Sequence, residues 1–302
     1  MSQSTDIKII IPPSDTSASY KPNLTRSNPA PVLKWYPPRH IHIPPPPNHS
    51  VMPAVNDRPA VRSHPKHSTT HPKKRWNVCG FKYALGCIKD PEDSRDRHMT
   101  RLPPALRAVL PAKIDYTRKM SPVSDQGDEG TCVGFAAVDG LKEYQEKAEW
   151  KKLIQLSVRY LYTEARKRDI FQSDEGTTIR SAMKALQKKG VPPEDCWKYR
   201  PHQKDKACKN ADELAKPYRI KQYACLETPD EMRESLFVNG PFVAGVDVYN
   251  DAWNTAEMSG KIPMPEKDDE VVGGHAIGIV GCDDRKELFK SKKLRSNSKG
   301  NF

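Results

Sequence analysis

The stretch of sequence that decides the fold is Gln126-Gly-Asp-Glu-Gly-Thr-Cys132-Val-Gly-Phe-Ala-Ala137. Beyond Cys132 the apolar residues recur at helical spacing, and Thr131 is a residue type that commonly caps a helix. The pattern therefore predicts a helix from Cys132 to about Lys147, with the thiol in its first turn.

A second informative stretch, Gly273-Gly-His275-Ala-Ile-Gly-Ile-Val-Gly281, lies far downstream. His275 leads a nearly apolar run over 276–280, which predicts a strand. The remaining patterns predict helices after Ser157, after Thr177 or Thr178 and after Thr228, a strand over 241–249, and a third strand beginning at 287–289. Because helices gather early and strands late, we expect an α+β fold with two lobes.

Cys132 is the strongest candidate nucleophile. A thiol attacks poorly until it ionises, and unpaired amides at a helix start, together with a nearby imidazolium, lower its pKa. The ordinary alternative is a buried structural cysteine, which is the commonest role of a free cysteine. We expect that role for the other six cysteines, which are Cys79, Cys87, Cys196, Cys208, Cys225 and Cys282.

Gln126 and His275 are the candidate partners of this thiol. Gln126 is either a plain loop residue or, since a glycine-containing loop can fold back over six residues, an amide donor beside the Cys132 N–H. Two such donors would hold the oxyanion of a tetrahedral intermediate, each worth about 3 kcal/mol. A lone histidine beside a strand more often has a structural role. His275 is nevertheless the candidate base, because regular secondary structure holds it in place.

These motifs resemble the papain-like cysteine peptidases, in the branch that lacks the secretory disulfides. The separation of 143 residues between Cys132 and His275 fits that family. Glu129 stands where secreted members carry a disulfide cysteine. The resemblance also includes Leu156–Tyr162, Glu175–Met183 and Gly190–Trp197. It implies a papain-like domain over residues 77–290, with a helical left lobe and an antiparallel β right lobe.

The same resemblance implies a role for each site residue. Cys132 would be the nucleophile, His275 its base and acid, and Gln126 the oxyanion donor. Gly176 and Gly274 would lie in the substrate cleft. The implied reaction is hydrolysis of a peptide or protein substrate through an acyl-enzyme, with no metal and no cofactor.

Two family features are missing from the sequence. The interspersed pattern of the usual inhibitory propeptide does not occur in residues 1–100, so we expect no zymogen clamp there. The family's Asn-Ser-Trp-Gly segment is expected near position 293, where this chain has a basic polar tail over 291–302. We therefore expect a right lobe that is incomplete at its C-terminus. The alternative function is a catalytically impaired pseudoenzyme that binds peptides or proteins as a scaffold.

The charge of the chain lies at its two ends. Residues 1–76 hold 15 of the 28 prolines and 6 of the 9 histidines, with 11 Lys/Arg against 3 Asp/Glu, whereas residues 77–289 hold 34 basic and 35 acidic residues. Dense proline favours polyproline II over helix or sheet, so we expect a disordered arm over 1–76 and an arm lying on the domain over 77–87. A neutral body argues against a specific nucleic-acid partner.

Three further expectations concern partners and location. The basic arm could touch an acidic partner weakly. A zinc site at His64, His67 and His71 is an alternative, but their spacing matches no compact finger. No run approaches the roughly 18 apolar residues of a membrane span. Since no signal peptide is visible either, we expect an intracellular, cytoplasmic protein.

Overall fold

The computed structural model describes residues 8–10, 75–78, 81–169, 175–249, 253, 256 and 259–292. Its helices are α1 (Pro104–Arg107), α2 (Cys132–Ala137), α3 (Glu143–Trp150), α4 (Val158–Arg166), α5 (Ile179–Lys188), α6 (Ala211–Ala215) and α7 (Pro229–Asn239). Its strands are β1 (Lys8–Ile10), β2 (Arg75–Val78), β3 (Phe81–Ala84), β4 (Cys87–Ile88), β5 (Lys113–Asp115), β6 (Thr177–Thr178), β7 (Phe242–Tyr249), β8 (Lys261–Ile262), β9 (Val271–Asp283) and β10 (Leu288–Lys292). None of the described helices is long and apolar enough to cross a bilayer.

Three helices begin where the sequence predicts, because a hydroxyl caps each of them. Ser157 accepts from the amide of Tyr160 at the start of α4, and Thr178 accepts from the amide of Ser181 in α5. Thr228 and Glu231 form a capping box at α7. Each cap satisfies amides that the first turn of a helix leaves without a partner.

The predicted helix at Cys132 is also present, in three parts. A π-helical segment, Val138–Lys142, joins α2 to α3. Thr131 occupies the N-cap position, yet its side chain makes no capping bond. Its hydroxyl lies 2.8 Å from the hydroxyl of Tyr199 instead. The predicted capping role of Thr131 was therefore wrong, because a partner in another segment takes its oxygen.

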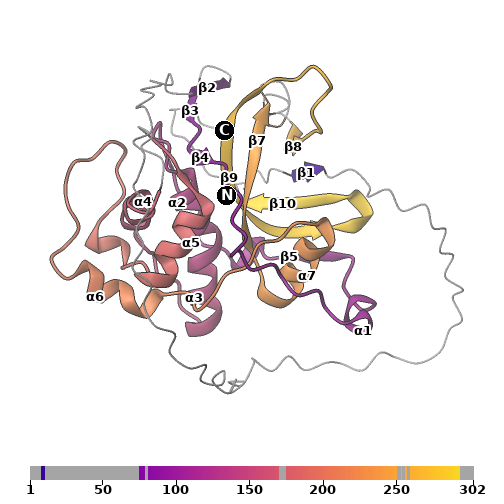
Figure 1. Cartoon of the computed structure of the whole chain (residues 1–302), viewed down its shortest axis with the longest axis horizontal. Helices are drawn as coiled ribbons and strands as arrows, with labels where there is room; N and C mark the ends of the chain where they lie inside the picture. Colours follow the sequence, from indigo (N-terminus) through magenta and orange to yellow (C-terminus); the bar gives the residue numbers. More distant parts are fainter. Residues whose placement is uncertain are drawn as a thin grey trace, which may run out of the picture. The chain divides into compact units, whose positions relative to one another are not determined.

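The right lobe is built around β9, the long central strand. β9 pairs antiparallel with β7, β10 and β5. The strand expected over 276–280 extends from Val271 to Asp283. Figure 1 shows α2 to α6 on one side of β9 and the other strands of this sheet on the opposite side. The expected two-lobe α+β arrangement is confirmed.

The lobes meet where α2 and the π-helical segment pack against β9. Phe135 and Ala276 are both fully buried in the core that these elements share. A Cβ on Gly278 would lie 2.7 Å from the Cα of Gly140. This close approach requires glycine on both sides, and it holds the start of α2 beside His275.

The predicted disordered arm and polar tail lie mostly outside the described residues. Within the arm, β1 pairs with β10 and β8, and β2 pairs with β3. At the other end, Ser291 and Lys292 are buried members of β10, so the strand runs two residues past the expected boundary at 290.

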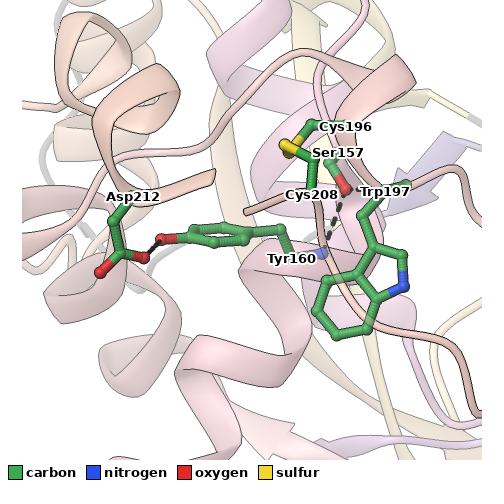
Figure 2. The surroundings of a disulfide bond; sticks show 6 residues. All are labelled: Ser157, Tyr160, Cys196, Trp197, Cys208 and Asp212. Atoms are coloured by element: carbon green, nitrogen blue, oxygen red, sulfur yellow. Dashed lines mark hydrogen bonds between the residues drawn. A yellow bond between two sulfur atoms is a disulfide. The ribbon is translucent and has the colours of Figure 1, made fainter. Parts of the chain in front are cut away.

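Cys196 and Cys208 form a disulfide, which corrects the prediction that both are free structural cysteines (Figure 2). The bridge closes the loop that leads to α6. On one side of it, Ser157 donates to the carbonyl of Trp197. On the other, Tyr160 donates to Asp212 at 2.6 Å. The location of the protein stays a prediction.

Candidate active site

Cys132 is the first residue of α2 and is fully buried. Burial raises the pKa of its thiol to about 11. The backbone amides of Ala276, Gly86 and Val133 hydrogen-bond the sulfur and lower the pKa by less. The amides at the helix start lower the pKa as expected, but in this arrangement the desolvation of a thiolate outweighs them.

Gln126 lies in the loop before α2, with its side chain turned into the protein. Its Nε2 donates to the carbonyl of Glu129 at 2.8 Å and to the carbonyl of Ala84 at 3.0 Å. The first bond fixes the amide within its own loop. The second bond points the side-chain amide at the carbonyl oxygen of a peptide group, which is the kind of atom that an oxyanion donor binds.

His275 lies in β9 one residue before Ala276, whose amide reaches the Cys132 sulfur. Its Nδ1 is buried and has no hydrogen-bond partner among the described residues. Burial lowers the pKa of the imidazole to about 4, because the charged form loses its hydration. The structure thus brings the backbone beside His275 into contact with the thiol, while burial favours the neutral form of the ring.

Trp253 packs against the ring of His275, a contact that no spacing of residues in the sequence predicts. The two rings meet edge to face, with centroids 5.6 Å apart. Trp253 is 6% exposed, so it lies inside the protein against this ring.

Glu129 holds the loop between Gln126 and Cys132 in place. Both oxygens of its carboxylate accept from the guanidinium of Arg159, and one also accepts from the amide of His202. Burial alone would raise the pKa of Glu129, but these hydrogen bonds outweigh it and lower the pKa. A buried ion pair thus stands where secreted relatives are expected to carry a disulfide.

The predicted cleft residues Gly176 and Gly274 both lie against a single extended segment, residues 84–88. A Cβ on Gly176 would lie 2.7 Å from the oxygen of Gly86. A Cβ on Gly274 would lie 2.3 Å from the oxygen of Cys87. Both predicted cleft glycines are therefore in close contact with the backbone of this segment, and neither has room for a side chain.

Residues 84–88 make main-chain contacts on both sides of Cys132. Gln126 binds the Ala84 carbonyl, and the Gly86 amide binds the Cys132 sulfur. The Gly86 carbonyl accepts from Thr177 at 3.0 Å, where β4 and β6 pair in parallel. The expected arm over 77–87 does lie on the domain, but it crosses the candidate site itself, which no pattern in residues 1–100 predicts.

In the part of the chain that the structure describes, no group of three or more His, Cys, Asp or Glu residues could hold a metal ion. The alternative zinc site at His64, His67 and His71 lies outside the described residues.

The comparisons with known proteins bear on the family and the fold of this chain. The model of the family described as papain family cysteine protease matches residues 110–294. The crystal structure of xylellain, a cysteine protease from Xylella fastidiosa, is similar with 30% identity and a TM-score of 0.58, covering 72% of this chain and 84% of that one. Procathepsin B S9 from Trypanosoma congolense shares the fold, with 17% identity, a TM-score of 0.50, and coverage of 65% of this chain and 70% of that one.

A curated relative from Acanthamoeba polyphaga mimivirus, an uncharacterized peptidase C1-like protein, is 26% identical over 177 residues. The alignment covers 55% of this chain and 57% of the relative, so the chain spans little more than half of the length of that protein. The family model covers well over half of the chain, and its match includes Gln126, Cys132 and His275. The chain therefore belongs to the papain family of cysteine proteases.

Proposed function

We propose that this chain is a cysteine peptidase that hydrolyses peptide bonds through an acyl-enzyme. Cys132 attacks the scissile carbonyl and forms a C–S bond as the C–N bond breaks. His275 takes the thiol proton and passes it to the leaving amine, and water then releases the acyl group. Gln126 and the Cys132 amide bind the oxyanion.

The observation that carries the proposal is the contact between Gln126 and a peptide carbonyl next to Cys132. The Gln126 amide donates to Ala84 O at 3.0 Å, and the Cys132 sulfur accepts the amide of Gly86 two residues further on. The site therefore binds an extended peptide backbone with the donor and the thiol on the same stretch. A donor and a thiol that both contact one stretch of peptide backbone support a site that acts on peptides.

The test measures turnover of a mixed peptide library. Because residues 84–88 cross the site, the assay uses both the full chain and its Gly86→Ala variant, each with and without Cys132→Ala. We expect turnover in at least one parent and its loss with Cys132→Ala. Cys225→Ala is the matched control, since Cys225 is a free cysteine outside the site and its removal should leave turnover unchanged. Absence of turnover in both parents would refute the proposal.

A second candidate function is a non-catalytic protein that binds peptides in the same cleft. One observation favours it: with a Cys132 pKa of about 11 and a His275 pKa of about 4, both groups are neutral at physiological pH. Burial therefore favours the neutral thiol and the neutral imidazole while residues 84–88 contact Cys132. Peptide binding without turnover, in the full chain and in the Gly86→Ala variant, would support this second function.

A further inference from the structure

The hydroxyl of Tyr199 joins the two ends of the loop that carries the candidate oxyanion donors. It donates to the carbonyl oxygen of Gln126 at 2.8 Å, and it lies 2.8 Å from the hydroxyl of Thr131, the residue before Cys132. A tyrosine hydroxyl has one proton, which Gln126 accepts, so the Thr131 hydroxyl is the donor of the second bond. The other acceptor within reach of Thr131 is the carbonyl of Glu129, which is further away at 3.4 Å.

The ring of Tyr199 is held by two helices of the left lobe. It meets the ring of Phe135 in α2 edge to face, with centroids 4.7 Å apart, and the guanidinium of Arg159 in α4 lies 4.7 Å from its centroid. The Tyr199 amide donates to Glu194 at 2.7 Å. Burial raises the pKa of Tyr199, so its hydroxyl keeps the proton that it donates. Contacts outside the loop therefore set the position of this hydroxyl.

The disulfide anchors the segment that carries Tyr199. Cys196 lies three positions before it in the chain, and the amide of Cys208 donates to the carbonyl of Cys196 at 3.0 Å. Ser157, at the start of α4, donates to the carbonyl of Trp197 at 2.6 Å (Figure 2). The backbone leading to Tyr199 is therefore attached to the helical lobe before the side chain reaches the loop.

The other contacts of the loop hold its middle. The carboxylate of Glu129 accepts from Arg159 and from the amide of His202, and the carbonyl of Glu129 accepts from Gln126 Nε2. The Tyr199 hydroxyl acts instead at the two ends, beside the side-chain donor and beside the backbone donor. Donors bind an oxyanion well only when both are already in place, so the separation of these ends matters for the chemistry.

We propose that Tyr199 is a positioning residue, which holds Gln126 and the Cys132 amide at the separation that a tetrahedral intermediate needs. This inference deepens the proposed function and rests on it, because it assigns a role in the same site. Tyr199 acts through Gln126 and Thr131 rather than on the reacting atoms. Without its hydroxyl the loop ends can move apart, which weakens binding of the transition state more than binding of the substrate.

The first experiment removes one hydroxyl from the full chain. Tyr199→Phe keeps the ring and its contacts with Phe135 and Arg159 but loses both hydrogen bonds to the loop. The matched control is Tyr160→Phe, which removes the hydroxyl that donates to Asp212 at 2.6 Å (Figure 2). Both variants make the same chemical change, and each removes hydrogen bonding to another segment of the left lobe.

Hydrogen–deuterium exchange with mass spectrometry measures the loop without any turnover. We expect the amides of residues 126–132 to exchange about tenfold faster in Tyr199→Phe than in the parent, because the loop opens locally more often. In Tyr160→Phe these amides should exchange at the rate of the parent. An unchanged rate in Tyr199→Phe, or the same acceleration in both variants, would overturn the proposal.

Kinetics separate positioning from a purely structural role. On one peptide that the parent cleaves, we expect kcat of Tyr199→Phe to fall about tenfold while KM stays within about twofold, since the displaced donors act in the transition state. Tyr160→Phe should match the parent in both constants. Faster exchange in Tyr199→Phe with an unchanged kcat, or with a raised KM alone, would show that the hydroxyl only stabilises the loop and would refute the positioning role.

Thr131 tests whether the two hydroxyls act as one link. Thr131→Ser keeps the donor and should exchange like the parent, whereas Thr131→Val loses it and should exchange faster. Combined with Tyr199→Phe, Thr131→Val should cause no further acceleration, because the bond is already absent. Accelerations that multiply in the double variant would show that the two residues act independently and would contradict the link.

Exchange does not require chemistry, so the two proposals can fail separately. Faster exchange in Tyr199→Phe alone, without hydrolysis by any form of the chain, would refute the peptidase and support the hold of Tyr199 on the loop. Hydrolysis that depends on Cys132, with the same exchange and the same kcat in Tyr199→Phe, would support the peptidase and refute the role of Tyr199.

Discussion

Replacing Arg159 by methionine should destabilise the protein strongly, because it leaves the Glu129 carboxylate buried without its partner. The guanidinium donates to both Glu129 oxygens and to the carbonyl of Arg200, and it lies 4.7 Å from the ring centroid of Tyr199. The two side chains are only 6% and 10% exposed. Removing one member of such a pair costs about 4 kcal/mol, while methionine keeps most of the aliphatic volume of the arginine.

A double-mutant cycle separates this effect from lost packing. Glu129→Gln alone leaves Arg159 buried without a counter-charge and should cost about 3 kcal/mol. The double variant buries neither charge, so we expect its loss of unfolding free energy to fall short of the sum by about 2 kcal/mol or more. Urea unfolding followed by circular dichroism measures all three. Additive losses would refute the reasoning, as would a loss under about 1 kcal/mol for Arg159→Met.

The exposed pair Lys216–Glu213 provides the control, because its side chains are 50% and 69% exposed. Lys216→Met should change the unfolding free energy by less than about 0.5 kcal/mol. The effect of pH is a further check. The pKa of Glu129 is lowered in the folded protein. The stability that its pair with Arg159 contributes is therefore present above the unfolded pKa of about 4.3 and is lost as the pH falls through the folded pKa.

Three further predictions concern stability and the reactive thiol. Replacing Cys196 and Cys208 by serine should lower the unfolding free energy by about 3 kcal/mol in urea, since their separation of 12 residues sets the loop entropy that the bridge removes; an unchanged value would contradict the bridge. Gly278→Ala should cost about 2 kcal/mol in the same assay, because its Cβ would meet Gly140 Cα at 2.7 Å, and a neutral effect would mean that the lobes separate easily. The alkylation rate of Cys132 in the full chain should increase with pH up to the thiol pKa of about 11, because only the thiolate reacts; a rate that stops increasing below pH 9 would show that burial does not control the pKa of this thiol.

Local signals in the sequence account for most of the helical lobe. The helices α4, α5 and α7 begin at hydroxyl caps, which are contacts between residues three apart and can be read without the fold. The same rule fails at Thr131, whose hydroxyl contacts Tyr199, 68 residues away. Sequence proximity identifies a possible cap, but it cannot exclude a competing partner from another segment.

The strands of the right lobe were harder to predict, because glycine weakens the strand pattern where the fold needs close packing. β9 extends well beyond the expected run at 276–280, and the residues that hid its ends include Gly273, Gly274 and Gly281. A Cβ on Gly281 would lie 2.3 Å from the Ile114 carbonyl oxygen in β5. In the sequence alone, such glycines predict the end of a strand. The fold requires them because a neighbouring backbone lies too close for a side chain.

Some residues of the candidate site could likewise be predicted from local sequence, and others could not. Gln126 and Cys132 were predictable because they share one loop and one helix start, and His275 because few histidines lie outside the arm. Trp253 was not, since its role depends on a contact with β9 that no spacing along the chain encodes.

Gly86 shows why the occupied cleft could not be predicted. Its neighbours in sequence suggest an ordinary turn in an arm, and the requirement for glycine arises only from Gly130 and Gly176, which lie 44 and 90 positions further on. The same contacts that exclude a side chain at Gly86 also bury Cys132 and raise the pKa of its thiol. Close packing of the backbone around Gly86 and protonation of the Cys132 thiol therefore have one cause, since both follow from the exclusion of water at the start of α2.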